Sequence, residues 1–130
     1  MIANAVFPAP KPSYKLGDFP TELVHLERPT VPLTYSFGTL IRYNGAYRHA
    51  SKSHAGHARA PPPPPANYFI IYAHPNAVDI GMMHDTLKYC ASFLHAHVLA
   101  FEYRGYGQCP GSAEDYECIL DAAAAWNFAT

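Results

Sequence analysis

The sequence predicts an α/β fold that is incomplete: a β-hairpin followed by a β-α-β-α order belonging to a parallel sheet. Two short, continuous runs of apolar strand formers, at 68–73 and 98–103, are typical of strands buried on both faces of such a sheet. A stretch with helical spacing of apolar residues follows each run, which favours parallel strands linked by helices. The 130 residues allow one domain. Since a further strand should follow the last helix, which reaches Thr130, we expect the amino-terminal part of a larger fold.

Composition and charge exclude several classes of protein. Apolar residues make up 49% of the chain and charged residues 15%, which argues against wholesale disorder. The net charge of −1 excludes a nucleic-acid binder that works mainly by neutralising phosphates. No apolar run reaches the roughly 18–20 residues of a membrane span. Residues 1–14 lack the basic start of a secretory signal, and Ile2 stands where N-myristoylation requires glycine.

The three cysteines predict free thiols. They are odd in number and have no CxxC spacing, which favours a reducing compartment over a disulfide or zinc framework. We therefore expect a location in the cytoplasm or on the cytoplasmic face of a membrane. Cys90 and Cys118 fall on apolar helix stripes and are expected in the core, whereas Cys109 lies in a loop and is expected to be the exposed thiol.

Prolines shape the first half of the chain. Residues 1–32 are expected to form an extended, Pro-rich segment, because proline excludes helix. The β-branched and aromatic residues of 33–43 predict a strand pair, or one strand bent at Gly38. Residues 44–66 form a low-complexity insertion rich in His and Pro, which ends in a run of five prolines. We interpret this run as a polyproline II spacer, with a ligand for SH3 or WW domains as the alternative.

Residues 67–130 carry the β-α-β-α order. After the strand at 68–73, a helix is expected over 81–95, with Asp79 as its N-cap. The spacing of the helix's apolar residues gives one stripe, formed by Met83, Leu87, Cys90, Ala91 and Leu94.

A second helix is expected after the strand at 98–103 and a loop marked by glycine and proline at 104–111. Ser112 and Asp115 have the spacing of a capping box that would open this helix. The face expected to be buried consists of Tyr116, Ile119, Leu120, Ala123 and Trp126.

Polar residues gather where the two apolar strands end. His74, Asn76 and Asp79 follow the first strand, and Glu102 and Arg104 follow the second. In open α/β sheets, working residues lie at the carboxyl ends of strands. A helix amino terminus, with its free amides, is directed at the same place, which suits the stabilisation of an anion or an oxyanion.

Four short motifs resemble one branch of the α/β-hydrolases. AHPNAVDIG at 73–81 resembles the HGNAxDxG loop of that branch, and EYRGYG at 102–107, followed by Pro-Gly, resembles its next loop. DAAAAW at 121–126 is similar to a DIxAAW helix, and FPAPKPSY at 7–14 is similar to an FLPPxPxY segment. In combination they resemble the alpha/beta hydrolase domain-containing protein 17 family, membrane-associated serine hydrolases that remove palmitoyl groups from proteins.

The resemblance implies roles for residues of both loops. The backbone N–H of Asn76 would supply one donor of the oxyanion hole, and His74 and Asp79 would shape its loop. Pro75 departs from the family's glycine and removes one amide, while the amide of Asn76 remains. The remaining residues implied to line the substrate crevice are Ala77, Tyr103, Arg104 and Tyr106.

The nucleophile of such an enzyme is not in this sequence. The fold carries serine on a G-x-S-x-G elbow, followed by Asp and His along the chain. None of the serines at 13, 36, 51, 53, 92 and 112 stands in that motif, and Ser112 is interpreted as a helix cap. The elbow and the other triad members are expected beyond Thr130, so the chain alone should be inactive.

Two further groups of residues have features of other kinds of site. Gly105-x-Gly107 between a strand and a helix is the start of a dinucleotide fingerprint, but Pro110 stands at its third glycine. His49, His54 and His57 could bind a metal, yet no acidic or cysteine partner lies near them. We therefore expect neither a cofactor nor a metal.

The preferred reading is the amino-terminal part of a serine hydrolase that cleaves acyl thioesters or esters. Its substrate would be an acylated protein or a lipid-like ester. Membrane association is a property of the resembled family, but its amino-terminal cysteine cluster is missing here. The alternative is a non-catalytic binding or regulatory fragment, which would use an open sheet edge or the proline run.

Overall fold

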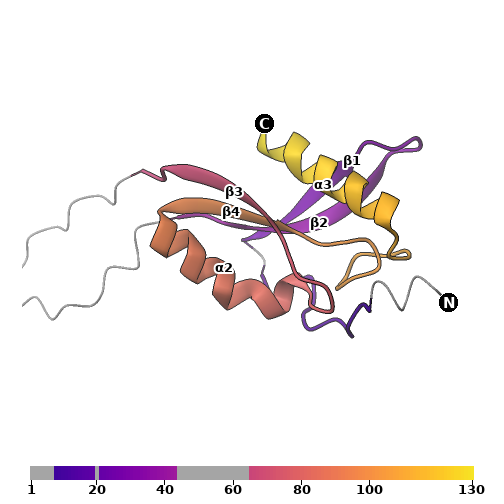
Figure 1. Cartoon of the computed structure of the whole chain (residues 1–130), viewed down its shortest axis with the longest axis horizontal. Helices are drawn as coiled ribbons and strands as arrows, with labels where there is room; N and C mark the ends of the chain where they lie inside the picture. Colours follow the sequence, from indigo (N-terminus) through magenta and orange to yellow (C-terminus); the bar gives the residue numbers. More distant parts are fainter. Residues whose placement is uncertain (1–7, 20, 44–64) are drawn as a thin grey trace, which may run out of the picture.

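Four strands and two helices follow one another in the computed structural model, which describes residues 8–19, 21–43 and 65–130 (Figure 1). The strands are β1 (Leu23–Arg28), β2 (Thr34–Ile41), β3 (Tyr68–Ala73) and β4 (Ala96–Phe101). The helices are α2 (Ile80–Leu94) and α3 (Asp115–Ala129). The proline run up to residue 64 and the three histidines at 49, 54 and 57 lie outside the described residues.

The strands form one mixed sheet in the order β1-β2-β4-β3. β1 and β2 are an antiparallel hairpin, with Leu26 opposite Ser36, and β2 is also antiparallel to β4. β3 and β4 are parallel, with Ile71 opposite Leu99, and α2 connects them. The β-α-β-α order is therefore confirmed as part of an α/β fold.

The hairpin is placed differently from the expectation. Residues 33–43 were expected to hold a strand pair or one strand bent at Gly38, and they hold the single strand β2. Its partner β1 comes from the segment 1–32, which was expected to be an extended, Pro-rich segment and in which no strand was predicted. The sequence of β1 does not have the pattern of a half-buried strand, because the charged Arg28 is buried on the same face as Leu26.

Helices cover both faces of the sheet, α2 on one and α3 on the other (Figure 1). In β4, Val98 and Ala100 pack on the α2 side, while Leu99 and Phe101 pack on the α3 side. The expectation of a strand buried on both faces is thus confirmed for β4. It is wrong for β3, where Tyr68 is 66% exposed, because β3 is the edge strand.

Helix α2 agrees with the sequence pattern to within a residue at each end. Its N-cap is Asp79, whose side chain accepts a hydrogen bond from the Met82 N–H at 2.9 Å, as predicted. Leu87 and Ala91 are buried against the sheet, whereas Leu94 at the end of the predicted stripe is exposed.

Helix α3 faces the sheet with a different side from the one expected. It begins at Asp115 after an N-cap Glu114 that makes no side-chain cap, so the capping box with Ser112 is wrong. The residues that meet the sheet are small or charged: Asp121, Ala124 and Ala125.

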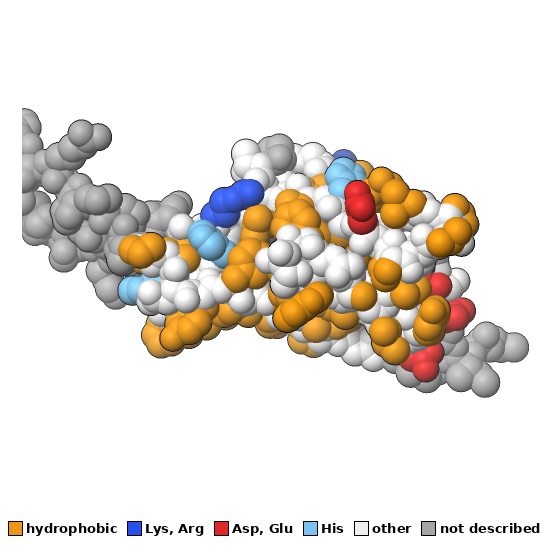
Figure 2. Space-filling model, turned by 90° about the horizontal axis from the view of Figure 1, so that it is seen from above, with side chains coloured by type: hydrophobic (Ala, Val, Ile, Leu, Met, Phe, Trp, Pro, Cys, Tyr) orange, Lys and Arg blue, Asp and Glu red, His pale blue; other side chains and the backbone are white. Residues whose placement is uncertain are grey.

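The stripe predicted to be buried on α3 is largely exposed. Tyr116, Ile119 and Trp126 are each more than 60% exposed. The alanines at 124 and 125 have little side chain, so they let the helix approach the sheet closely and leave the larger residues outside. Figure 2 views the molecule from above relative to Figure 1, from the side of α3 and β3. Most of the coloured side chains on this face are hydrophobic and few are charged.

Candidate functional site

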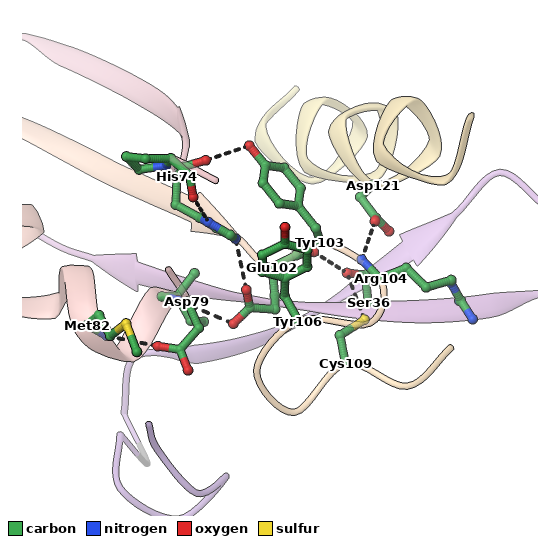
Figure 3. Close-up of polar contacts among 12 residues, drawn as sticks. Ser36, His74, Asp79, Met82, Glu102, Tyr103, Arg104, Tyr106, Cys109 and Asp121 are labelled. Atoms are coloured by element: carbon green, nitrogen blue, oxygen red, sulfur yellow. Dashed lines mark hydrogen bonds and ion pairs between the residues drawn. The ribbon is translucent and has the colours of Figure 1, made fainter. Parts of the chain in front are cut away.

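Two loops meet at the carboxyl ends of β3 and β4, as the strand-end argument predicts (Figure 3). The first loop contains 74–79 and leads into α2, and the second contains 102–111. The Tyr103 hydroxyl donates to the backbone oxygen of His74 at 2.8 Å, and the Tyr106 hydroxyl donates to Asn76 Oδ1 at 2.5 Å. The loops therefore hold each other through direct hydrogen bonds.

The centre of the site is Glu102, which is fully buried. One carboxylate oxygen lies 2.9 Å from His74 Nε2 (Figure 3). The other accepts from the Tyr14 hydroxyl at 2.8 Å and from the Ile80 N–H at 3.3 Å. A single side chain thus joins the amino-terminal segment, the 74–79 loop and the start of α2.

Asp79 makes a second attachment for the amino-terminal segment. Besides capping α2, its carboxylate accepts from the Ser13 N–H at 2.7 Å and from the Ser13 hydroxyl. Asp79 is fully buried, although Ser13 is exposed. His74, by contrast, is buried between rings, with the Tyr103 ring 4.1 Å away between centroids.

The residues of the first loop that face solvent are Pro75, Asn76 and Ala77. Ala77 has a φ of 62°, which lies in the left-handed region. This conformation is energetically unfavourable for any residue that has a Cβ atom. The Ala77 N–H donates to Asn76 Oδ1 at 3.2 Å, the same atom that accepts from Tyr106. Pro75 stands where the family has glycine, and its carbonyl oxygen lies 3.0 Å from His74 Nδ1.

The glycines of the second loop are explained by packing. At Gly107, where φ is +51°, an added Cβ would collide with the carboxylate of Glu102 and with the Tyr14 hydroxyl. At Gly105, where φ is +82°, it would meet backbone atoms of residues 111–113. This need for space explains why glycine stands at both positions.

Arg104 is directed toward α3 rather than toward the first loop. The backbone N–H of Arg104 donates to Asp121 Oδ2 at 2.7 Å, and the side-chain Nε of Arg104 lies 3.3 Å from a carboxylate oxygen of Glu117. Asp121 also accepts from Arg28 Nε at 2.9 Å, and Arg28 forms an ion pair with Glu117. These contacts attach α3 to β1 and to the second loop.

The expectation of an exposed Cys109 is wrong. Turns within the loop, from the Gly105 N–H to the Cys109 oxygen and from the Cys109 N–H to the Tyr106 oxygen, fold the cysteine inward. Its sulfur lies 3.6 Å from the Ser36 hydroxyl, and burial raises the pKa of the thiol. Cys90 and Cys118, expected in the core, are only partly buried, and all three thiols are free.

Three residues of this region were missed from the sequence. Tyr14, Arg28 and Asp121 are all buried and join distant segments. Tyr14 and Asp121 lie inside motifs that resemble the family, but nothing in a single sequence pairs them with Glu102 and Arg28. An acid within an apolar helical run, as at Asp121, is the one local signal that could have been used.

The Tyr103 hydroxyl allows a prediction about pH. Burial, followed by the charges that Cys118, Tyr106 and Glu102 would carry, raises the pKa of Tyr103 from 10.0 to about 12. The folded state therefore holds this proton more tightly than the unfolded state. Its contribution to stability is complete below pH 10 and is lost as the pH rises from about 10 to about 12.

Tyr103→Phe should accordingly flatten the fall of the free energy of unfolding between pH 10 and 12, which urea denaturation at a series of pH values measures. Tyr35→Phe is the matched control, because Tyr35 is 47% exposed on β2 and its replacement should leave the slope unchanged. Equal slopes for wild type and Tyr103→Phe would refute the prediction.

The described residues contain no group of three or more His, Cys, Asp or Glu side chains that could hold a metal ion. In the same part of the chain, neither helix has the length and apolar character needed to cross a membrane. A shallow hollow of about 210 Å³ lies between β1 and α3, and its lining residues are His25, Glu27, Ala124, Asn127 and Phe128.

Comparison with known proteins gives related sequences over part of the chain. Alpha/beta hydrolase domain-containing protein 17B of Xenopus laevis and of Homo sapiens are each 32% identical over 63 residues, which is 48% of this chain and 22% of each relative. Alpha/beta hydrolase domain-containing protein 17C of Mus musculus is 30% identical over 63 residues, or 48% of this chain and 20% of the relative. No protein-family model and no solved structure matches the chain.

The resemblance inferred from the loop motifs is therefore confirmed: the chain has curated homologues among alpha/beta hydrolase domain-containing proteins. The match spans only about a fifth of the length of these relatives.

Proposed function

We propose that this chain supplies the amino-terminal part of an α/β-hydrolase fold in a serine hydrolase that cleaves acyl thioesters or esters. The observation that carries the proposal is the 74–79 loop, which is held at the carboxyl end of β3 directly before the first turn of α2. This is the place where an α/β sheet binds its ligand. Relatedness to alpha/beta hydrolase domain-containing proteins supports the same proposal.

In the proposed reaction, a serine nucleophile attacks the acyl carbon and negative charge develops on the carbonyl oxygen. The backbone N–H of Asn76 would donate to that oxygen, and a second donor would come from the residue after the nucleophile. The contribution of this chain is to hold the first donor in place before the reaction begins. Preorganised donors of this kind supply much of the rate enhancement in acyl transfer.

The substrate is proposed to be an acylated protein, as in a protein depalmitoylase, or a lipid-like ester. The exposed apolar stripe of α3 and the edge strand β3 support a larger fold, because both are surfaces that further sheet and helix layers would bury. The nucleophile and its Asp and His partners would then come from sequence beyond residue 130.

The test is labelling of the full-length gene product with a serine-directed fluorophosphonate. We expect one labelled serine, mapped by mass spectrometry to a G-x-S-x-G sequence downstream of residue 130. Heat-denatured protein is the negative control, and Ser112→Ala, which removes the one serine here that follows a glycine, should label like wild type. Absence of labelling on well-folded protein would refute the catalytic proposal.

A second candidate function is non-catalytic binding through the free edge of β3. The sequence of this strand, YFIIYA, contains no charged residue and no proline, and Tyr68 and Phe69 are 66% and 43% exposed. Such an edge is open to pairing with a strand from another chain. A sharp, cooperative thermal transition of the isolated monomer would count against this candidate, whereas concentration-dependent association through β3 would favour it.

A further inference from the structure

The side chain of Tyr106 is fully buried, yet its hydroxyl reaches a residue at the surface. The hydroxyl donates to Asn76 Oδ1 at 2.5 Å, across the two loops. The Tyr106 ring is itself fixed, because it packs edge-on against the ring of Tyr103 at 5.5 Å between centroids. The backbone N–H of Tyr106 also donates to the backbone oxygen of Tyr103 at 2.9 Å. A rigid donor therefore meets the exposed asparagine.

The side chain of Asn76 links Tyr106 to the backbone of the 74–79 loop. Its Oδ1 accepts a second hydrogen bond, from the N–H of Ala77 at 3.2 Å. Ala77 has a φ of 62°, so the backbone here is held in a conformation that a residue with a Cβ rarely adopts. The side chain of Asn76 thus ties a strained peptide to Tyr106, and the direction of the neighbouring Asn76 N–H depends on the same backbone.

We propose that Tyr106 is a positioning residue for the Asn76 backbone N–H, acting through the side chain of Asn76. This inference rests on the proposed function, because the N–H has a task only if an oxyanion forms beside it. Tyr106 is fully buried, so in this proposal it acts only through Asn76. Its role is to keep the donor aimed at the position that the oxyanion occupies in the transition state.

Tyr106→Phe in the full-length protein should lower kcat for hydrolysis of an acyl ester such as p-nitrophenyl octanoate by about tenfold. That is less than the 100-fold or more typical for complete removal of an oxyanion donor. KM should stay within about twofold, since the contact matters in the transition state and not in substrate binding. Asn76→Ala retains the backbone N–H and should show at least the same loss, because it also removes the acceptor of the Ala77 N–H.

Because both changes break the contact between Tyr106 and Asn76, the double variant should be no slower than Asn76→Ala alone. The pH profile should keep its shape in Tyr106→Phe, because the tyrosine donates a hydrogen bond and does not exchange a proton. Tyr35→Phe removes a tyrosine hydroxyl on β2, outside the two loops, and should leave kcat and KM unchanged.

The outcomes separate this inference from the proposed function. If fluorophosphonate does not label wild type, the proposed function fails. If wild type is labelled but folded Tyr106→Phe keeps wild-type kcat, the positioning role is overturned and the hydrolase proposal stands, whatever the rate of Asn76→Ala. A rise in KM at constant kcat would also overturn it. If Tyr106→Phe does not fold, Asn76→Ala still tests the role, because wild-type kcat in this variant would overturn it. Asn76 is exposed, so its replacement leaves the core intact.

Discussion

Replacement of Glu102 by alanine is expected to lower the free energy of unfolding by about 3–5 kcal/mol, the range typical when one partner of a buried charged contact is removed. Glu102 is fully buried and contacts Tyr14, His74 and the N–H of Ile80. Without the carboxylate, these groups lose their partner in a place that water does not reach. Unsatisfied buried polar groups each cost free energy that an exposed contact would not.

Urea denaturation followed by far-UV circular dichroism measures this loss through the two helices. Glu102→Gln keeps the shape and one acceptor oxygen, so its loss should be intermediate. Glu27→Ala is the control, because Glu27 is exposed on β1 and its removal should change the free energy of unfolding by no more than about 0.5 kcal/mol. A loss below about 1 kcal/mol for Glu102→Ala would show that the carboxylate does not hold the two loops together.

Replacement of Asp121 by alanine is expected to have a loss of similar size, about 3 kcal/mol or more. The side chain of Arg28 is only 3% exposed, and Asp121 accepts from its Nε at 2.9 Å. The change would leave this guanidinium with Glu117 as its remaining carboxylate partner. It would also free the N–H of Arg104 from its acceptor, and so loosen the second loop from α3.

A double variant distinguishes the loss of a charged partner from the loss of packing at Arg28 and Asp121. In Arg28→Met with Asp121→Leu, no buried charge is left without a partner, so much of the stability should return. Asp85→Ala is the control on α2, because the side chain of Asp85 is fully exposed. If Asp121→Ala were as stable as Asp85→Ala, the contact with Arg28 would contribute nothing to attaching α3.

The elements that the sequence predicts best carry their signals locally. β3 is a continuous run of strand formers, and its bounds agree with the expectation. α2 has an N-cap, Asp79, and an apolar stripe within its own 15 residues. β4 was expected over 98–103 and both begins and ends two residues earlier, because a strand end depends on pairing with neighbouring strands.

The elements that were misjudged depend on partners far away in the chain. β1 was missed because its inward Arg28 is acceptable only beside Asp121, 93 residues later. α3 has apolar residues on more than one side, so its periodicity could not tell which side meets this sheet. Cys109 was placed outside because a loop composition does not reveal turns that fold a side chain inward.

The candidate site divides in the same way. That His74, Asn76, Tyr103 and Tyr106 come together follows from two parallel strands ending at one edge of a sheet. That Glu102 joins them to Tyr14 and the amino-terminal segment could not be predicted, because the bond connects residues 88 apart.

We propose that these loops form the front of a serine hydrolase whose nucleophile follows in the same gene. The most direct test is to sequence the transcript beyond the codon for Thr130. We expect an open reading frame that continues into a strand, a G-x-S-x-G elbow and a helix. A stop codon directly after Thr130, or a long continuation without that elbow, would contradict the claim.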